Sequence, residues 1–108
     1  MSKEFLKEAS RLNEVKEIAG SVRKIIEEEI SRRGSWLGAF DSVVFRVENR
    51  LYDPRAEGEL GSDEYTEILD DINALRERVN QFKTQYPEGD LPEKLRDELV
   101  EFLQEAVK

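Results

Sequence analysis

The sequence of 108 residues contains no cysteine and no histidine. Without cysteine the chain has no disulfide framework, no thiolate zinc site and no cysteine nucleophile. Without histidine it lacks the commonest general base and transition-metal ligand, which excludes Ser-His-Asp triads and the Glu-x-x-His di-iron sites of helical bundles. These absences lean against an enzyme, but they leave carboxylate chemistry open.

Long hydrophobic runs are also absent, since no stretch approaches the roughly 18 apolar residues of a membrane-spanning helix. The opening Met1-Ser2-Lys3-Glu4 has no apolar core of a secretory signal, so we expect a cytoplasmic protein that does not bind membranes. The net charge of −8 points the same way, because anionic lipids and nucleic acids are bound by basic surfaces. We therefore expect no direct binding of nucleic acid.

Charged residues, by contrast, are abundant. They make up 39% of the chain, and 38% of residues are hydrophobic and periodically placed. Disordered chains lack such periodicity, so this composition predicts folded helices with charged outer faces. The length predicts one helical domain over residues 1–108.

One apolar stripe runs along the second half of the chain with alternating spacings of three and four residues. Its members are Tyr65, Ile68, Ile72, Leu75, Val79, Phe82 and Tyr86. This coiled-coil-like spacing is typical of a helix that packs along its whole length against other helices, and it predicts a helix over residues 63–86. Similar patterns predict helices over residues 3–33, 35–52 and 92–107, separated by a loop at 53–62 and a turn before Pro92.

The predicted fold is therefore all-α and resembles a four-helix bundle. At about 1.5 Å per residue, the helix over 3–33 would be roughly 45 Å long, against about 24 to 33 Å for the other three. We expect it either to kink near Gly20 or to extend into a second subunit, and a homodimer follows from the latter. Its apolar stripe matches that of residues 63–86, so these two helices are predicted to pair at the centre.

Acidic residues crowd the N-terminal end of the 63–86 helix. Asp63, Glu64, Glu67, Asp70 and Asp71 fall on one helical face. Carboxylates at this spacing can hold Mg²⁺, and Glu64, Glu67, Asp70 and Asp71 are the candidate metal ligands. The same row also approximates the spacing of phosphates along a nucleic-acid strand, as in an acidic inhibitor that mimics nucleic acid. A purely solvated face is the third interpretation, because acidic residues stabilise helix N-termini.

Glu67-Ile68-Leu69-Asp70 resembles the Glu-x-x-Asp motif of the all-α nucleoside triphosphate pyrophosphohydrolases of the MazG kind. The resemblance covers about six residues and implies a Mg²⁺-dependent enzyme. That family's other motif, Glu-Glu-x-x-Glu, is missing in its usual form. Glu27-Glu28-Glu29 and the pair Glu14 and Glu17 are partial substitutes, and neither has the third carboxylate of the motif.

Aromatic and basic residues of the 35–52 helix are candidates for binding a protein. Trp36 and Phe40 could anchor a partner or pack in the core. Arg46 and Arg50 are one turn apart and could bind a carboxylate or phosphate, or balance the acidic residues of a neighbouring helix. Asp63 is a further candidate on the acidic face.

These observations favour a non-catalytic helical interaction protein, such as an adaptor, assembly factor or regulator, that binds a protein partner, itself or both. We expect no cofactor, with Mg²⁺ as the exception that the acidic row would allow. The alternatives are the nucleic-acid mimic and, second, the Mg²⁺-dependent pyrophosphohydrolase.

Overall fold

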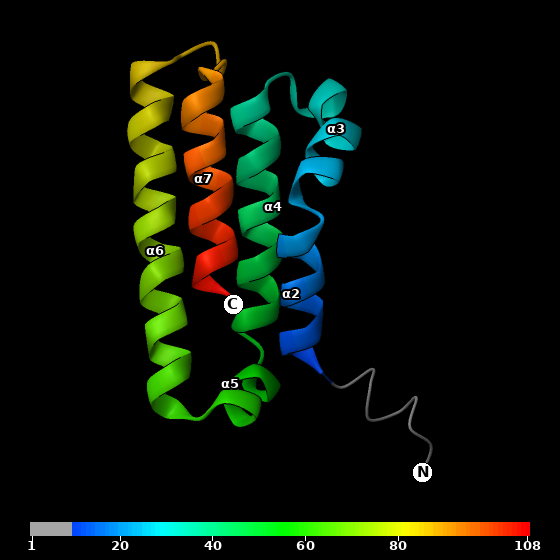
Figure 1. Ribbon diagram of the computed structural model, residues 1–108, viewed down its shortest axis with the longest axis vertical. Helices are drawn as coiled ribbons and strands as arrows, with labels where there is room; N and C mark the ends of the chain where they lie inside the picture. The colour runs from blue at the N-terminus through cyan, green and yellow to red at the C-terminus, as the bar shows by residue number, and fades with distance from the viewer. Residues whose placement is uncertain (1–9) are drawn as a thin grey trace.

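The computed structural model describes residues 10–108, which form six α-helices and no strand (Figure 1). The helices are α2 (Arg11–Gly20), α3 (Val22–Arg33), α4 (Trp36–Leu51), α5 (Pro54–Leu60), α6 (Ser62–Gln85) and α7 (Glu93–Ala106). The predicted all-α fold is confirmed. None of the described helices is long and apolar enough to cross a membrane. Residues 3–9 of the predicted first helix lie outside the described part of the chain.

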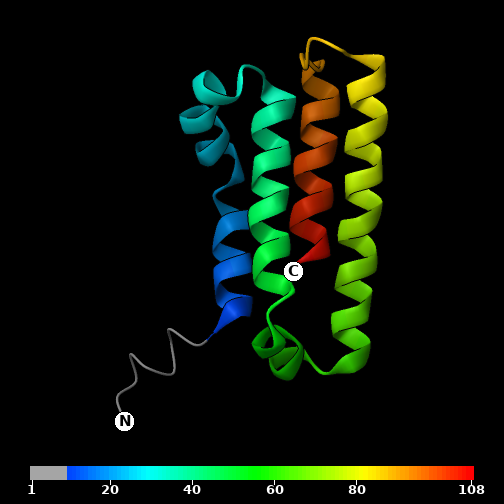
Figure 2. The same ribbon diagram turned by 180° about the vertical axis from the view of Figure 1, so that it is seen from behind.

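Helix α4 is the centre of the fold. It packs against α2, α3, α5 and α6, and nine of its sixteen residues are buried. Helix α7 packs against α2 and α6, and its buried residues share one hydrophobic core with those of α4. Figures 1 and 2 both place α6 at one edge and α2 with α3 at the other, with α4 and α7 between them. The predicted central pairing of the first helix with residues 63–86 is therefore wrong for the described residues.

Three predicted helices match the structure to within one residue at each end: α4, α6 and α7. The stripe of α6 faces inward, with Ile72, Leu75 and Val79 buried and its other members half-buried. Helix α4 begins after Ser35, whose hydroxyl accepts a hydrogen bond from the Gly38 N–H at 3.1 Å. This N-cap satisfies one of the free N–H groups at the start of the helix.

The predicted helix over 3–33 is divided in the structure. Helix α2 ends at Gly20 and α3 begins at Val22, with Ser21 at φ −107° and ψ 14° between them. The side-chain amide of Gln104 in α7 donates a hydrogen bond to the Ala19 carbonyl at 3.1 Å. Because that carbonyl lies at the helix end, the contact from α7 satisfies an acceptor next to the division.

The predicted loop over 53–62 contains a helix, α5, so the loop prediction is wrong. The Asp53 carboxylate accepts the Arg55 N–H at 2.9 Å and caps the helix, and Pro54 occupies its first turn. Proline is well suited to that position because it lacks an N–H that would need a partner. Ala56 is fully buried, and this short helix packs against α2, α4 and α6. With α5 and the division at Ser21, the described residues form six helices rather than four.

A tight contact joins the α6–α7 turn to the start of α4. Gly89 has φ +80°, and its carbonyl accepts a hydrogen bond from the Leu37 N–H at 3.1 Å. A side chain at this position would collide with Ser35. Gly20 differs, since a methyl group added there meets no atom within 4 Å.

We predict that the two glycines respond oppositely to alanine. Gly89→Ala should lower the free energy of unfolding by more than about 1 kcal/mol, because it adds a clash to a left-handed backbone conformation. Gly20→Ala should raise it by roughly 0.5 to 1 kcal/mol, because alanine loses less backbone entropy on folding. Urea unfolding monitored by circular dichroism measures both. Equal effects would contradict the described packing around the α6–α7 turn.

Candidate functional site

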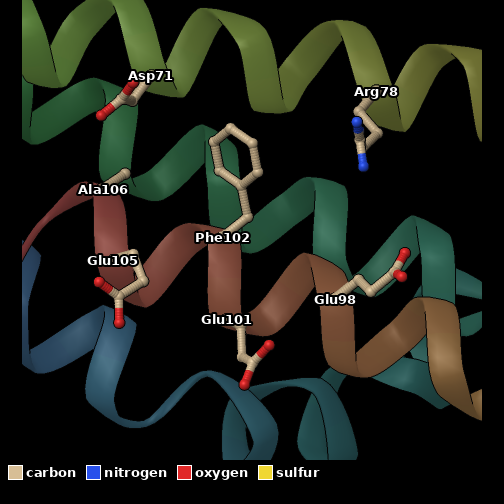
Figure 3. A pocket seen from close by; sticks show the side chains of 7 residues that line it. All are labelled: Asp71, Arg78, Glu98, Glu101, Phe102, Glu105 and Ala106. Carbon is tan, nitrogen blue, oxygen red and sulfur yellow. The ribbon is translucent and has the colours of Figure 1, made fainter.

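A solvent-open groove of about 420 Å³ lies between α6 and α7 (Figure 3). Its lining residues are Asp71, Arg78, Glu98, Glu101, Phe102, Glu105 and Ala106. Four of these seven side chains are carboxylates, and one is basic. The groove thus combines an apolar floor with an acidic rim.

The α7 side of the groove carries most of its negative charge. Glu98, Glu101 and Glu105 are all exposed and follow the i, i+3, i+7 spacing of one helical face. In Figure 3 Glu101 and Glu105 point away from α6, whereas the Phe102 ring stands between the two helices. Phe102 is half-buried and packs against the core, which fixes its position.

The α6 side contributes Asp71 and Arg78. Asp71 is half-buried, and Glu64 and Glu67 precede it on the same face with the same three-then-four spacing as the α7 row. Ion pairs within the described chain leave Asp71, Glu98 and Glu101 without a basic partner, and Glu105 has only Lys108 at 3.9 Å. The rim therefore presents mainly carboxylates to solvent, with Arg78 as the one basic side chain among its lining residues.

The candidate metal ligands Glu64, Glu67, Asp70 and Asp71 do not converge. Within residues 10–108, no group of three or more carboxylates is arranged to hold a metal ion. Glu64, Glu67 and Asp70 are exposed, as is Asp63 in the first turn of α6. The Mg²⁺ site stays a prediction, and the pyrophosphohydrolase interpretation depends on it.

The aromatic candidates Trp36 and Phe40 lie in the core. Phe40 is fully buried, Trp36 is 7% exposed, and their rings stack with centroids 5.3 Å apart. The Arg96 guanidinium lies over the Trp36 ring, 5.6 Å from the ring centre. The core interpretation fits both side chains, and a partner-binding role for them stays a prediction.

The basic candidates Arg46 and Arg50 lie on α4, and Arg50 contacts α2. The Nε of Arg50 is 4.0 Å from the Glu14 carboxylate, and its Nη1 donates to the Arg46 carbonyl at 3.3 Å. Arg50 thus balances an acidic residue of a neighbouring helix, one of the two interpretations of its position. Arg46 is half-buried beside it.

A second polar cluster, which the sequence interpretation missed, joins α2 to α5. The Glu59 carboxylate accepts hydrogen bonds from the Ser10 hydroxyl at 2.8 Å and from the N–H groups of Arg11 and Leu12 at 2.8 and 3.3 Å. Asp53 accepts Arg11 Nε at 2.8 Å and Arg55 Nη2 at 3.0 Å. Glu59 therefore caps the start of α2 from another helix.

These contacts lower the pKa of both carboxylates. For Asp53, the hydrogen bonds from Arg55 and then Arg11 hold the pKa well below its usual range. For Glu59, burial alone raises the pKa, but the hydrogen bonds from Arg11, Ser10 and Leu12 outweigh it and the net shift is downward. Both residues are therefore ionised at neutral pH, and the cluster serves to hold the helices together.

The α7 carboxylates were also missed by the sequence interpretation. Their signal is present, because Glu98, Glu101 and Glu105 flank Phe102 on a helix whose inner face is otherwise apolar. What the sequence lacked was the identity of the neighbouring helix that turns this face into a groove. Comparison with protein-family models, curated proteins and solved structures finds no match to this chain.

We predict that the α2–α5 cluster makes the fold acid-sensitive. Because the folded-state pKa of Asp53 and Glu59 lies below the unfolded value, their contribution is present at neutral pH and is lost as pH falls below about 4. Stability measured by urea unfolding from about pH 7 to about pH 3 should fall less steeply in the Asp53→Asn, Glu59→Gln variant. Glu101→Gln on exposed α7 is the control and should keep the wild-type slope. Parallel slopes for all three proteins would contradict the role of the cluster.

Proposed function

We propose that the protein is a non-catalytic helical interaction protein, an adaptor, assembly factor or regulator, that binds a protein partner through the α6–α7 groove. The observation that carries this proposal is the combination of the half-buried Phe102 with three carboxylates of the groove, Asp71, Glu98 and Glu101, that have no basic partner among residues 10–108. Protein interfaces typically place an aromatic residue in a desolvated centre and charged residues on a hydrated rim. Both parts are present in this groove.

The charge of the rim supports a basic partner. Glu98, Glu101 and Asp71 have no basic partner among the described residues, so a cationic surface can approach them without displacing an internal ion pair. Rim charges of this kind accelerate association and select partners more than they add affinity. A partner with the opposite charge would therefore be favoured both in rate and in specificity.

We predict that reversing the rim charge abolishes partner binding. A photo-crosslinker placed at position 105 of the otherwise wild-type protein should capture a partner protein from the source cells. The same crosslinker in the Glu98→Lys, Glu101→Lys variant should no longer capture that partner. The control Glu27→Lys, Glu28→Lys changes the net charge equally at exposed positions of α3 and should leave the capture unchanged. Equal loss in both variants would reduce the effect to net charge and overturn the proposed site.

The second candidate function is that of an acidic inhibitor that mimics nucleic acid and binds a protein partner through the same groove. It is favoured by the row Glu64, Glu67 and Asp71, which continues the acidic rim of the groove along α6. Its distinguishing outcome is competition, because an excess of duplex DNA should then displace the captured partner. A partner that DNA does not displace supports the adaptor or assembly form instead.

Self-association is a separate candidate, supported by the outer face of α4. Phe45 of α4 and Tyr52, the residue that follows the last residue of α4, are 57% and 58% exposed and lie seven residues apart, about two helical turns. Two α4 helices packed antiparallel about a two-fold axis would bring Phe45 of each copy against Tyr52 of the other. Such a face is self-complementary in the way that a homodimer requires.

We predict that Phe45→Ser, Tyr52→Ser converts a dimer into a monomer in sedimentation equilibrium. Ile30→Ser, which also changes an exposed apolar residue but on α3, is the control and should leave the dimer intact. A wild-type protein that remains monomeric at about 100 μM would remove the homodimer, because self-association weaker than about 5 kcal/mol leaves little dimer at cellular concentrations.

A further inference from the structure

We propose that the α6–α7 groove binds a basic amphipathic α-helix of another protein, which lies along the two helices and places an apolar stripe on Phe102 and Ala106. This inference rests on the proposed function, because it names the partner class for the same groove. It commits to a helix rather than to an extended peptide, and to a different chain rather than to a second copy of this one.

The spacing of the carboxylates carries the choice of a helix. Glu98, Glu101 and Glu105 recur at intervals of three and four residues, and Glu64, Glu67 and Asp71 repeat the same intervals on α6. At about 1.5 Å per residue, neighbouring carboxylates are separated by roughly 4.5 and 6 Å along each helix. Lysines and arginines at i, i+3 and i+7 of a bound helix have the same uneven spacing. An extended peptide repeats every 6.8 Å or so on each face and loses this register.

The floor of the groove supports the same choice. Phe102 stands between α6 and α7, and Ala106 follows it by one turn on α7 (Figure 3). A large residue followed by a small one, four residues apart, leaves a depression that a leucine or isoleucine of a third helix can enter. Helices that bind in this way are anchored by apolar residues at i, i+3 or i+4, and i+7.

Charge decides between another chain and a second copy. The protein carries a net charge of −8, so two copies repel each other at the acidic rim. A cationic helix is attracted to that rim, and its Lys or Arg side chains can reach Glu98, Glu101 and Asp71 while their aliphatic stems lie on the apolar floor. The occupant that fits the groove is therefore basic on its flanks and apolar along its centre.

Three synthetic peptides test the inference by fluorescence anisotropy with the intact protein. The first is a helix of about 18 residues with a leucine stripe flanked by lysines. The second has the same sequence with the leucines of the stripe changed to alanine, and the third has the composition of the first in an order without a stripe. The protein is the same with all three peptides, so the comparison among the peptides does not depend on any protein substitution.

The first peptide should bind at least about tenfold more tightly than either of the others, which corresponds to about 1.4 kcal/mol. Its binding should weaken by a similar factor in the Glu98→Gln, Glu101→Gln, Glu105→Gln protein. Glu27→Gln, Glu28→Gln on α3 is the matched control and should bind as the wild type does. Binding should also fall as salt is raised from about 50 to about 300 mM, since the rim charges are exposed.

The outcomes separate this inference from the proposed function. Equal binding of all three peptides would overturn the proposal of a bound amphipathic helix and leave only a general attraction between opposite charges. If no peptide binds but the crosslinker still captures a partner at the groove, the proposal of a bound helix is overturned. The proposed function is then retained. If no peptide binds and the crosslinker captures no partner, the groove is not a binding site.

Discussion

The burial of α4 on more than one side is the constraint on which the rest of the structure depends. Val43 and Val44 are adjacent in the sequence and both are fully buried, so no single neighbouring helix can cover this segment. Adjacent residues on a helix point about 100° apart, and each direction needs its own cover. Helices α2 and α3 cover one side of α4 and α6 covers another, while α5 packs against it as well.

The division of the first helix is consistent with this constraint. Both α2 and α3 pack on α4, and the interruption of the helix at Ser21 divides the two segments that cover it. Gln104 of α7 satisfies the Ala19 carbonyl at the same place, so the turn and the position of α7 support each other. Helix α7 closes the ring on α2 and α6, and its outer side becomes the surface with the acidic groove.

The sequence predicted the bounds of the helices much better than it predicted which helices pack against each other. The α6 stripe from Tyr65 to Tyr86 placed that helix to within one residue, because its period is long and regular. A stripe indicates that one face is buried, but not which helix buries it, so the pairing of the first helix with α6 was wrong. Helix α5 was missed because Asp53-Pro54 was interpreted only as the end of α4, although the same pair also starts a helix.

The sequence predicted only part of the candidate site, for the same reason. The acidic row on α6 is a local pattern, and the sequence predicted it together with Asp71 at its end. The row on α7 is equally local, but it becomes a binding surface only when antiparallel packing sets it beside α6 with Phe102 between them. Such a groove is a product of tertiary structure, and the spacing within either helix contains no information about it.

Two groups of carboxylates among the described residues need different explanations. Glu48, Glu59 and Asp53 contact basic or N–H groups of other elements, so the fold itself accounts for them. Glu98 and Glu101 contact no such group among the described residues, and like charges one turn apart repel each other by a few tenths of a kcal/mol. A solvated face tolerates that repulsion, but nothing in folding requires the row to lie beside a half-buried aromatic ring. A cationic partner would remove the repulsion and cover the ring at the same time, which is why the two features are better explained together than apart.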